Sequence, residues 1–171
     1  MIKKYFLPTS YVDNFTNITP ARLNQLGVRA VIIDLDNTLV GYDEMDANEK
    51  VVNWFKLMND NDFKVTIVSN GKRKRVSNFA DPHDIDYIFN AQKPLSKNYK
   101  KAIRSMDVPK DETIMVGDQL MTDIFGANLI GLKSILVMPV KSKDGYATLL
   151  NRRMEGIIMR YFRKRGLLVK E

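Results

Sequence analysis

The hydrophobic residues of this chain gather in five short runs that are rich in β-branched side chains. Some runs, such as Val31 to Ile33, are continuously apolar, which is typical of parallel strands covered on both faces. The pattern therefore predicts a mostly parallel five-stranded sheet. The predicted strands are Arg29 to Ile33, Lys64 to Val68, Ile85 to Phe89, Glu112 to Val116 and Lys133 to Met138.

Segments with apolar residues at helical spacing separate these runs. In Asp46 to Asn59 the apolar residues include Trp54, which we expect in the hydrophobic core. Alternating strands and helices predict a three-layer α/β/α, Rossmann-like fold with its site at the carboxyl ends of the strands. We expect residues 1–171 to form a single domain with a basic helical segment at about 145–165. The other predicted helices are Thr19 to Gly27, Leu95 to Met106 and Leu120 to Leu129.

The composition excludes several kinds of chemistry. The chain has no cysteine, which rules out disulfides, Cys-ligated zinc, iron–sulfur clusters and a thiol nucleophile. Its one histidine, His83, rules out a two-histidine zinc motif and leaves a Ser-His-Asp triad a single possible base. We expect His83 in an exposed loop. Every apolar run is shorter than the roughly 18 residues of a membrane-spanning helix, so we expect a cytoplasmic protein.

The formal net charge of +7 is unevenly distributed along the chain. Residues 1–130 contain 17 basic and 17 acidic residues, whereas residues 131–171 contain 10 basic and 3 acidic residues. Excess positive charge is typical of proteins that meet nucleic acid, anionic lipid or acidic substrates. Any such contact should therefore involve the C-terminal part.

Two carboxylates, Asp34 and Asp36, follow the first predicted strand. Their spacing places both side chains on the same side of an extended chain. Two negative charges so close together favour a bound cation or proton. An Asp-rich turn is the simpler interpretation. An EF-hand loop fits less well, because Thr38 and Leu39 stand where its pattern has Asp or Asn and Gly.

This segment resembles the DxDx[TV] first motif of the haloacid dehalogenase-like (HAD) superfamily. The other motifs follow in the same order: Ser69 after the second predicted strand, Lys93, and a GDxxxxD sequence from Gly117 to Asp123. The resemblance spans at least residues 29–137. It implies the HAD fold and a magnesium-dependent phosphatase that acts on phosphomonoesters.

The resemblance also implies a role for each carboxylate. Asp34 would attack phosphorus and form an aspartyl-phosphate. Asp36 would protonate the leaving oxygen and then deprotonate the attacking water. Mg²⁺ would be held by the carboxylates of Asp34 and Asp118 and by the backbone carbonyl of Asp36.

Six further residues complete the implied site, and Thr38 and Gly117 are among them as supporting residues. The Ser69 hydroxyl and the backbone N–H of Asn70 would bind phosphate oxygens, and Lys93 would offset negative charge. Asp123 would bind the metal through water or orient Lys93. Considered alone, Ser69 also fits a helix cap, Thr38 the cap of a turn, and Lys93 a surface lysine.

The spacing between motifs leaves no room for an inserted cap domain. Asp34 and Ser69 are 35 residues apart and Ser69 and Lys93 are 24 apart, so one helix and one strand fill each interval. By family analogy, an uncapped site suits a large, surface-presented phosphate or a small one enclosed by a neighbouring subunit. We expect Gly41 to Glu44 to form a small flap beside it.

More closely, the chain resembles the YqeG-type proteins of HAD subfamily IIIA. That group is similar to the mitochondrial phosphatidylglycerophosphate phosphatases, which implies a lipid head group as substrate, an anionic membrane surface as partner and a peripheral position at the membrane. The segments that suggest it are Leu7 to Val12, Ile18 to Pro20, Asp34 to Val40 and Asn151 to Leu168.

Two basic clusters are candidates for contacts with an anionic partner. Lys72 to Arg75 follows the second motif and either lies at the mouth of the site or forms a solvated helix face. In Arg152 to Arg165 basic residues surround an apolar stripe, which either packs on the core or lies on anionic lipid; nucleic acid would also fit the charge. The stripe is Met154, Ile157, Ile158 and Tyr161.

Two alternatives to a phosphatase stay open. The first is a non-catalytic or weakly catalytic HAD scaffold that binds RNA, a ribosome or membrane through its basic C-terminus. The second is a receiver-type regulator phosphorylated on Asp34. Retention of every catalytic residue argues against the first, and a general acid at Asp36 favours turnover over the second.

Overall fold

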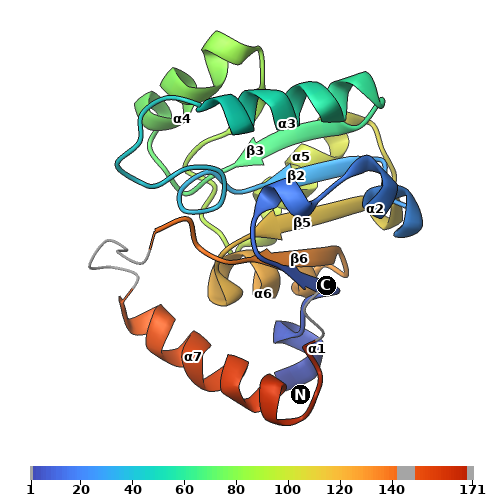
Figure 1. Cartoon of the computed structure of the whole chain (residues 1–171), viewed down its shortest axis with the longest axis vertical. Coiled ribbons are helices and arrows are strands. Elements are labelled where there is room, and N and C mark those ends of the chain that lie inside the picture. The colour runs from blue at the N-terminus through green and yellow to red at the C-terminus, as the bar shows by residue number, and fades with distance from the viewer. Residues whose placement is uncertain (1, 142–148, 169–171) are drawn as a thin grey trace.

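Six strands form one sheet in the order β1-β6-β5-β2-β3-β4, and every neighbouring pair is parallel (Figure 1). The computed structural model describes residues 2–141 and 149–168. The strands are β1 (Ser10–Val12), β2 (Ala30–Ile33), β3 (Lys64–Val68), β4 (Asp86–Ile88), β5 (Thr113–Gly117) and β6 (Lys133–Val137). The α-helices are α1 (Ile2–Phe6), α2 (Pro20–Gln25), α3 (Glu49–Asp60), α4 (Arg73–Ala80), α5 (Ser96–Met106), α6 (Phe125–Leu129) and α7 (Leu149–Lys164).

Four shorter helical turns connect these elements. Three of them are 3₁₀ turns, and η4 is a π-helical turn that leads directly into α6. The predicted helix from Leu120 to Leu129 is therefore two elements in succession. The turns are η1 (Phe15–Asn17), η2 (Asp81–His83), η3 (Lys110–Glu112) and η4 (Leu120–Ile124).

The prediction of five strands was wrong by one. All five predicted strands are present with ends shifted by at most one residue, but β1 adds a sixth at the sheet edge, beside β6. With only three residues, β1 is too short to produce a recognisable apolar run. The sheet is also entirely parallel in the described residues, rather than mostly so.

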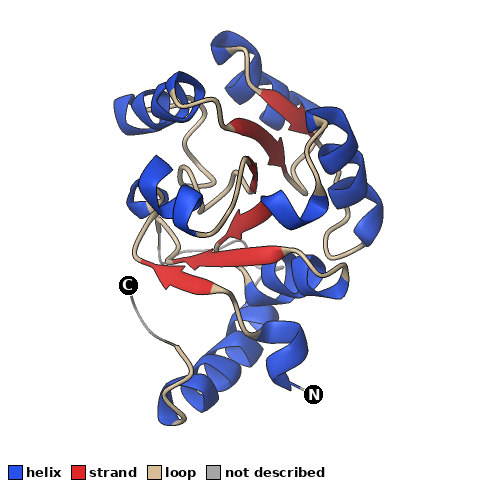
Figure 2. Cartoon of the chain, turned by 90° about the vertical axis from the view of Figure 1, so that its right-hand side faces the viewer, coloured by secondary structure: helices blue, strands red, loops and turns tan. Residues whose placement is uncertain are grey.

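Helices cover both faces of the sheet (Figure 2). Side chains alternate along β2, so Val31 and Ile33 pack with residues of α2, α3 and α4, whereas Ala30 and Ile32 pack with residues of α5 and α6. The two hydrophobic clusters therefore lie on opposite sides of one sheet, which confirms the three-layer α/β/α fold.

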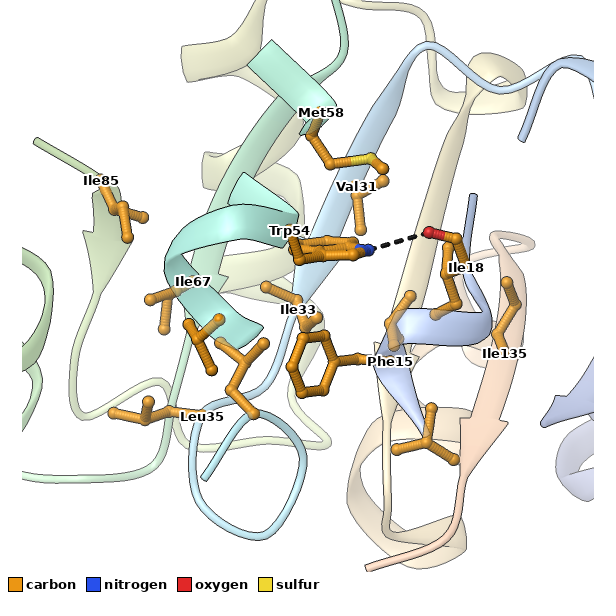
Figure 3. Packing of buried hydrophobic residues seen from close by; sticks show 14 of the residues in the cluster. Phe15, Ile18, Val31, Ile33, Leu35, Trp54, Met58, Ile67, Ile85 and Ile135 are labelled. Atoms are coloured by element: carbon orange, nitrogen blue, oxygen red, sulfur yellow. Dashed lines mark hydrogen bonds between the residues drawn. The ribbon is translucent and has the colours of Figure 1, made fainter. Parts of the chain in front are cut away.

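Trp54 lies in the first of these clusters, as predicted (Figure 3). Its indole N–H donates to the backbone carbonyl of Ile18 at 2.8 Å, and its ring meets that of Phe15 edge to face with centroids 5.8 Å apart. The hydrogen bond satisfies the polar atom of a buried side chain, and it ties α3 to the segment before β2.

Local capping explains where two helices begin. The Thr19 side chain accepts the N–H of Arg22 and Pro20 is the first residue of α2, as the sequence indicates. The Asn48 side chain accepts the N–H of Val51, so α3 starts three residues later than the predicted Asp46.

The order of the strands determines where side chains can converge. From β2 the chain proceeds to β3 and β4, and it then returns to place β5 on the other side of β2. Ile33 is paired with Val116, so the loops after β2 and β5 leave the sheet side by side. Such a reversal point is where open α/β sheets bind ligands. Residues 34–93, all of which are described, contain no inserted cap domain.

Helix α7 packs beside the β1–β6 edge of the sheet (Figure 1). Among the α7 side chains that the structure describes, Glu155 and Phe162 are buried, whereas Met154 and Ile157 of the predicted apolar stripe are 45% and 68% exposed. The predicted stripe is therefore divided: Ile158 packs against the core, whereas Met154 and Ile157 face outward. The expected start of this helix near residue 145 lies outside the described residues. Among those described, no helix has the length and apolar content needed to cross a bilayer.

Candidate active site

Asp34 leaves the sheet directly after β2. Its backbone N–H donates to the carbonyl of Val116 at 2.9 Å, which extends the pairing of β2 with β5 by one residue. The chain then turns sharply: Asn37 has a left-handed φ of 64° and its N–H donates to the carbonyl of Val40 at 2.7 Å. Pairing followed by a turn leaves the Asp34 carboxylate almost fully buried at the carboxyl end of the sheet.

Lys93 bridges two of the predicted carboxylates. Its buried ammonium lies 2.6 Å from Oδ1 of Asp34 and 2.7 Å from Oδ1 of Asp123. Burial alone lowers the pKa of Lys93, but the charges of Asp123 and Asp34 outweigh it and raise the pKa above the ordinary value. The ammonium therefore keeps its charge. Lys93 is not the solvated surface lysine that its sequence position also allowed.

Asp123 reaches Lys93 from the π-helical turn η4. The backbone N–H of Gln119 donates to Oδ2 of Asp123 at 3.1 Å, which leaves Oδ1 for the lysine. Burial raises the pKa of Asp123 to about 6, and Lys93 opposes that rise. Gly117 makes this approach possible, because a Cβ there would lie 2.2 Å from Oδ2 of Asp123. In this arrangement, Asp123 orients Lys93.

Thr38 lies between Asp34 and Asp118. Its hydroxyl is 3.3 Å from Oδ2 of Asp34 and 3.2 Å from Oδ1 of Asp118, so a single proton is shared between two carboxylates. The hydroxyl is fully buried and contacts the acidic cluster directly. Thr38 therefore does not only cap a turn, because its hydroxyl also contacts two carboxylates.

The acidic cluster fits a divalent cation. Ligand oxygens of Asp34, Asp118 and Asp123 all lie within 4.8 Å of one another. With Lys93 included, the four side chains carry a formal charge of −2. Carboxylate oxygens are the ligands that Mg²⁺ prefers, and a cation would offset the cost of burying like charges. Of the three, Asp34 and Asp118 face each other across Thr38, whereas Lys93 occupies Oδ1 of Asp123.

Ser69 and Asn70 follow β3, next to this cluster in the sheet. The Ser69 hydroxyl accepts the N–H of Gly71 at 3.0 Å, so it closes a local turn ahead of α4. The side-chain oxygen of Asn70 accepts the N–H of Lys93 at 2.8 Å. Asn70 thus holds the backbone that presents the lysine, a contact its sequence position did not indicate.

Asp36 is more exposed than Asp34 and has a different partner. Nε and Nη2 of Arg75 lie 3.1 Å and 2.8 Å from Oδ1 of Asp36. Burial raises the pKa of Asp36, and the adjacent guanidinium partly opposes this rise. Of the basic cluster Lys72 to Arg75, Arg75 is thus the member at the site.

The predicted flap, Gly41 to Glu44, forms a turn on the other side of this loop. Glu44 N–H donates to the carbonyl of Gly41 at 3.0 Å. The ammonium of Lys141 lies 2.6 Å from a carboxylate oxygen of Asp43 and 3.0 Å from one of Glu44. These exposed ion pairs contribute little to stability, yet they tie the turn to the segment that follows β6.

Two side chains behind the site were not predicted to take part in it. The hydroxyl of Tyr99 donates to the carbonyl of Thr122 at 2.8 Å, and Glu155 of α7 accepts the N–H of Met121 at 3.1 Å. Both contacts support the turn that carries Asp123. The acid at position 155 could have been noticed as the single acidic residue among the basic ones of its helix.

A groove lies far from the acidic cluster. It has a volume of about 610 Å³ and lies between α3 and the amino ends of β3 and β4, with His83 in its wall. His83 is exposed, as expected, and lies in η2. Because Asp34 is at the opposite ends of the strands, the groove is separate from the candidate active site.

Comparison with known proteins identifies the family. A family model described as HAD-hydrolase-like matches residues 90–151. Over 166 residues the chain is 42% identical to the "Probable phosphatase YqeG" of Bacillus subtilis, covering 97% of this chain and 96% of that protein. The chain belongs to this family of HAD phosphatases. The predicted YqeG-type family and the phosphatase class are thereby confirmed.

More distant relatives agree with this assignment. A glyceraldehyde 3-phosphate phosphatase of Pyrococcus furiosus is 46% identical over 44 residues, which are 26% of this chain and 18% of that protein. The cobalt-bound deoxy-D-mannose-octulosonate 8-phosphate phosphatase YrbI of Haemophilus influenzae shares the fold, with a TM-score of 0.51 and 15% identity over 79% of this chain and 89% of that chain.

Proposed function

We propose that the protein hydrolyses phosphomonoesters with Mg²⁺ through an aspartyl-phosphate formed on Asp34. The observation that carries this proposal is the buried Asp34 carboxylate, held by Lys93 and lying beside Asp118 at the reversal point of the sheet. Asp34 is fixed by its neighbours before substrate arrives, and such positioning is the main source of catalysis in phosphoryl transfer.

Each residue then has a defined part in the reaction. A carboxylate oxygen of Asp34 bonds to phosphorus while the bond to the leaving oxygen breaks, and Asp36 gives that oxygen its proton. Water then attacks the phosphorus and loses a proton to Asp36, which frees Asp34 and inorganic phosphate. Lys93 offsets the negative charge throughout.

Asp34, Asp118 and the backbone carbonyl of Asp36 would hold the Mg²⁺. The ion would supply Lewis-acid polarisation of the phosphoryl group. The Ser69 hydroxyl and the N–H of Asn70 would bind phosphate oxygens. For Ser69 this requires that its proton point to substrate while its oxygen still accepts from Gly71.

The experiment that tests this proposal is hydrolysis of 4-nitrophenyl phosphate with Mg²⁺. Asp34→Asn keeps the size of the side chain but removes the nucleophile, so we expect kcat to fall on the order of a thousandfold or more. Asp60→Asn, at the exposed end of α3, is the matched control and should keep wild-type activity. Turnover by Asp34→Asn equal to that of the control would exclude the covalent mechanism.

A phosphorylated lipid head group is the substrate class we propose, with phosphatidylglycerophosphate as the first compound to test. Two observations support it. The site has no cap domain over it, so a phosphate presented at a surface can reach it. The exposed face of α7 also combines Ile157 with Arg153, Arg160 and Lys164, which suits anionic lipid.

A comparison of two phosphate esters tests the substrate class. Phosphatidylglycerophosphate in mixed micelles should be hydrolysed with a kcat/KM at least about tenfold above that of water-soluble glycerol phosphate, because surface attraction raises the local substrate concentration. Equal values for the two esters would contradict the lipid proposal and leave the phosphatase chemistry intact.

A further inference from the structure

Arg75 is held on three sides. Two of its nitrogens contact Asp36, its Nη1 donates to the carbonyl of Met45 at 3.3 Å, and its guanidinium lies 5.8 Å from the ring centroid of Phe79. Its side chain is only 14% exposed. Arg75 therefore joins helix α4 to both halves of the loop that follows Asp34.

The contact with Asp36 is made to one oxygen only. Nε and Nη2 both donate to Oδ1, and no described residue donates a hydrogen bond to Oδ2. The two donors of the rigid guanidinium fix the position of Oδ1, and because the backbone fixes Cβ, this also sets the rotation of the carboxyl group about its Cβ–Cγ bond. With Oδ1 engaged, Oδ2 is the oxygen that can carry a proton to or from a substrate.

We propose that Arg75 is a positioning residue that aims Oδ2 of Asp36 at the leaving oxygen of the substrate. This inference rests on the proposed function, in which Asp36 moves the proton. A direct phosphate contact by Arg75 is disfavoured, because it would require the guanidinium to leave Asp36, Met45 and Phe79. The preceding residues Lys72, Arg73 and Lys74 are exposed and remain available for attracting anions.

The proposal predicts a loss that depends on the leaving group. A poor leaving group such as phenol needs its oxygen protonated as the bond breaks, whereas 4-nitrophenol leaves readily as an anion. Misaligning Asp36 should therefore slow phenyl phosphate more than 4-nitrophenyl phosphate. The ratio of the two kcat/KM values does not depend on the fraction of active enzyme. A partial loss of folded protein therefore leaves the ratio unchanged.

The experiment compares Arg75→Met, Arg75→Lys and the matched control Arg73→Met with both esters. Arg73 lies on the same helix and contacts the ring of Phe89 instead of Asp36. We expect Arg75→Met to lower kcat/KM for phenyl phosphate about a hundredfold and to change that for 4-nitrophenyl phosphate less than about tenfold. Arg75→Lys should shift the ratio less, since lysine keeps the charge but lacks the paired donors. Arg73→Met should leave the ratio unchanged.

Three outcomes would overturn the inference. Equal losses with both esters would make Arg75 a structural or phosphate-binding residue, and wild-type kcat/KM for both esters would make its contact with Asp36 irrelevant to catalysis. If Arg75→Met does not fold, a wild-type ratio in Arg75→Lys has the same meaning. Wild-type protein that hydrolyses neither ester would instead overturn the proposed function, and this inference with it.

Discussion

At the scale of single residues, the absence of a side chain at Gly117 sets the geometry of the site. Asp123 fills the space that a Cβ would occupy, and it holds Lys93, which in turn holds Asp34. A displacement at Gly117 therefore passes through two ion pairs to Asp34, the proposed nucleophile. The three residues come from different strands or turns, so their alignment depends on close packing.

Gly117→Ala tests this chain of contacts. The added methyl group must push Asp123 away, so we expect kcat to fall by about tenfold to a hundredfold, as misplacements near 1 Å do. The matched control is Gly156→Ala, in α7, where no described atom beyond the adjoining residues and the helix's own backbone lies within 4 Å of the added carbon. The control should keep kcat and gain about 0.5–1 kcal/mol of stability in chemical denaturation. A Gly117→Ala enzyme with wild-type kcat contradicts this account.

Sequence reasoning named the acidic residues that the structure brings together but did not indicate the partner of Asp36. Asp34, Asp118 and Asp123 belong to short motifs, and their meeting follows from strand order alone. The contact between Asp36 and Arg75 depends on how far α4 leans over the loop after β2. That angle is set by tertiary packing, which no local pattern encodes.

At the scale of elements, α7 is both packed and exposed. Phe162 and Glu155 attach it to the body of the protein, and its outer face carries Ile157 among basic residues. The sequence left core packing and surface binding as alternatives for one stripe. The structure divides the stripe, because Ile158 packs against the core while Met154 and Ile157 are exposed.

Charge reversal on α7 tests whether the outer face meets lipid. Each basic residue near an anionic surface contributes on the order of 1 kcal/mol, so Arg160→Glu with Lys164→Glu should weaken binding to phosphatidylglycerol vesicles at least about tenfold. The matched control is Lys97→Glu with Lys101→Glu on α5, which has the same spacing and exposure. Co-sedimentation provides the measurement. Equal losses in the two pairs, or binding to RNA but not to vesicles, would contradict a lipid surface.

The elements themselves were largely predictable. Buried parallel strands produce apolar runs that are easy to recognise, and caps such as Thr19 mark where helices start. Edge strand β1 was not predicted, because it has only three residues and its hydrogen-bonded partner β6 lies far along the chain. The π-helical turn η4 was not distinguished from an α-helix, because its residues fit an ordinary helix equally well.

At the scale of the whole molecule, residues 1–130 have no formal net charge, but the candidate active site within them is negatively charged. The buried side chains Asp34, Asp118, Asp123 and Lys93 together carry a formal charge of −2. Because like charges destabilise one another when buried, a divalent cation bound there should stabilise the fold as well as assist the chemistry.

Magnesium should therefore raise the melting temperature. At a concentration 100-fold above Kd, binding adds about 2.7 kcal/mol, or roughly 5–10 °C for a protein of this size. EDTA should reverse the shift, and Asp118→Asn should reduce it, whereas Asp60→Asn should not. Differential scanning fluorimetry measures this without any substrate. An Asp118→Asn protein with the full magnesium shift would remove Asp118 from the metal site.

The hydrogen bond from Met121 to Glu155 bears on the order of synthesis. Every residue of the proposed catalytic set precedes α7 in the chain, yet the turn that carries Asp123 lacks the carboxylate that accepts one of its N–H groups until α7 has been synthesised. A nascent chain therefore holds a loosely supported centre, and docking of α7 tightens it. Packing of α7 therefore completes the support of the turn that carries Asp123.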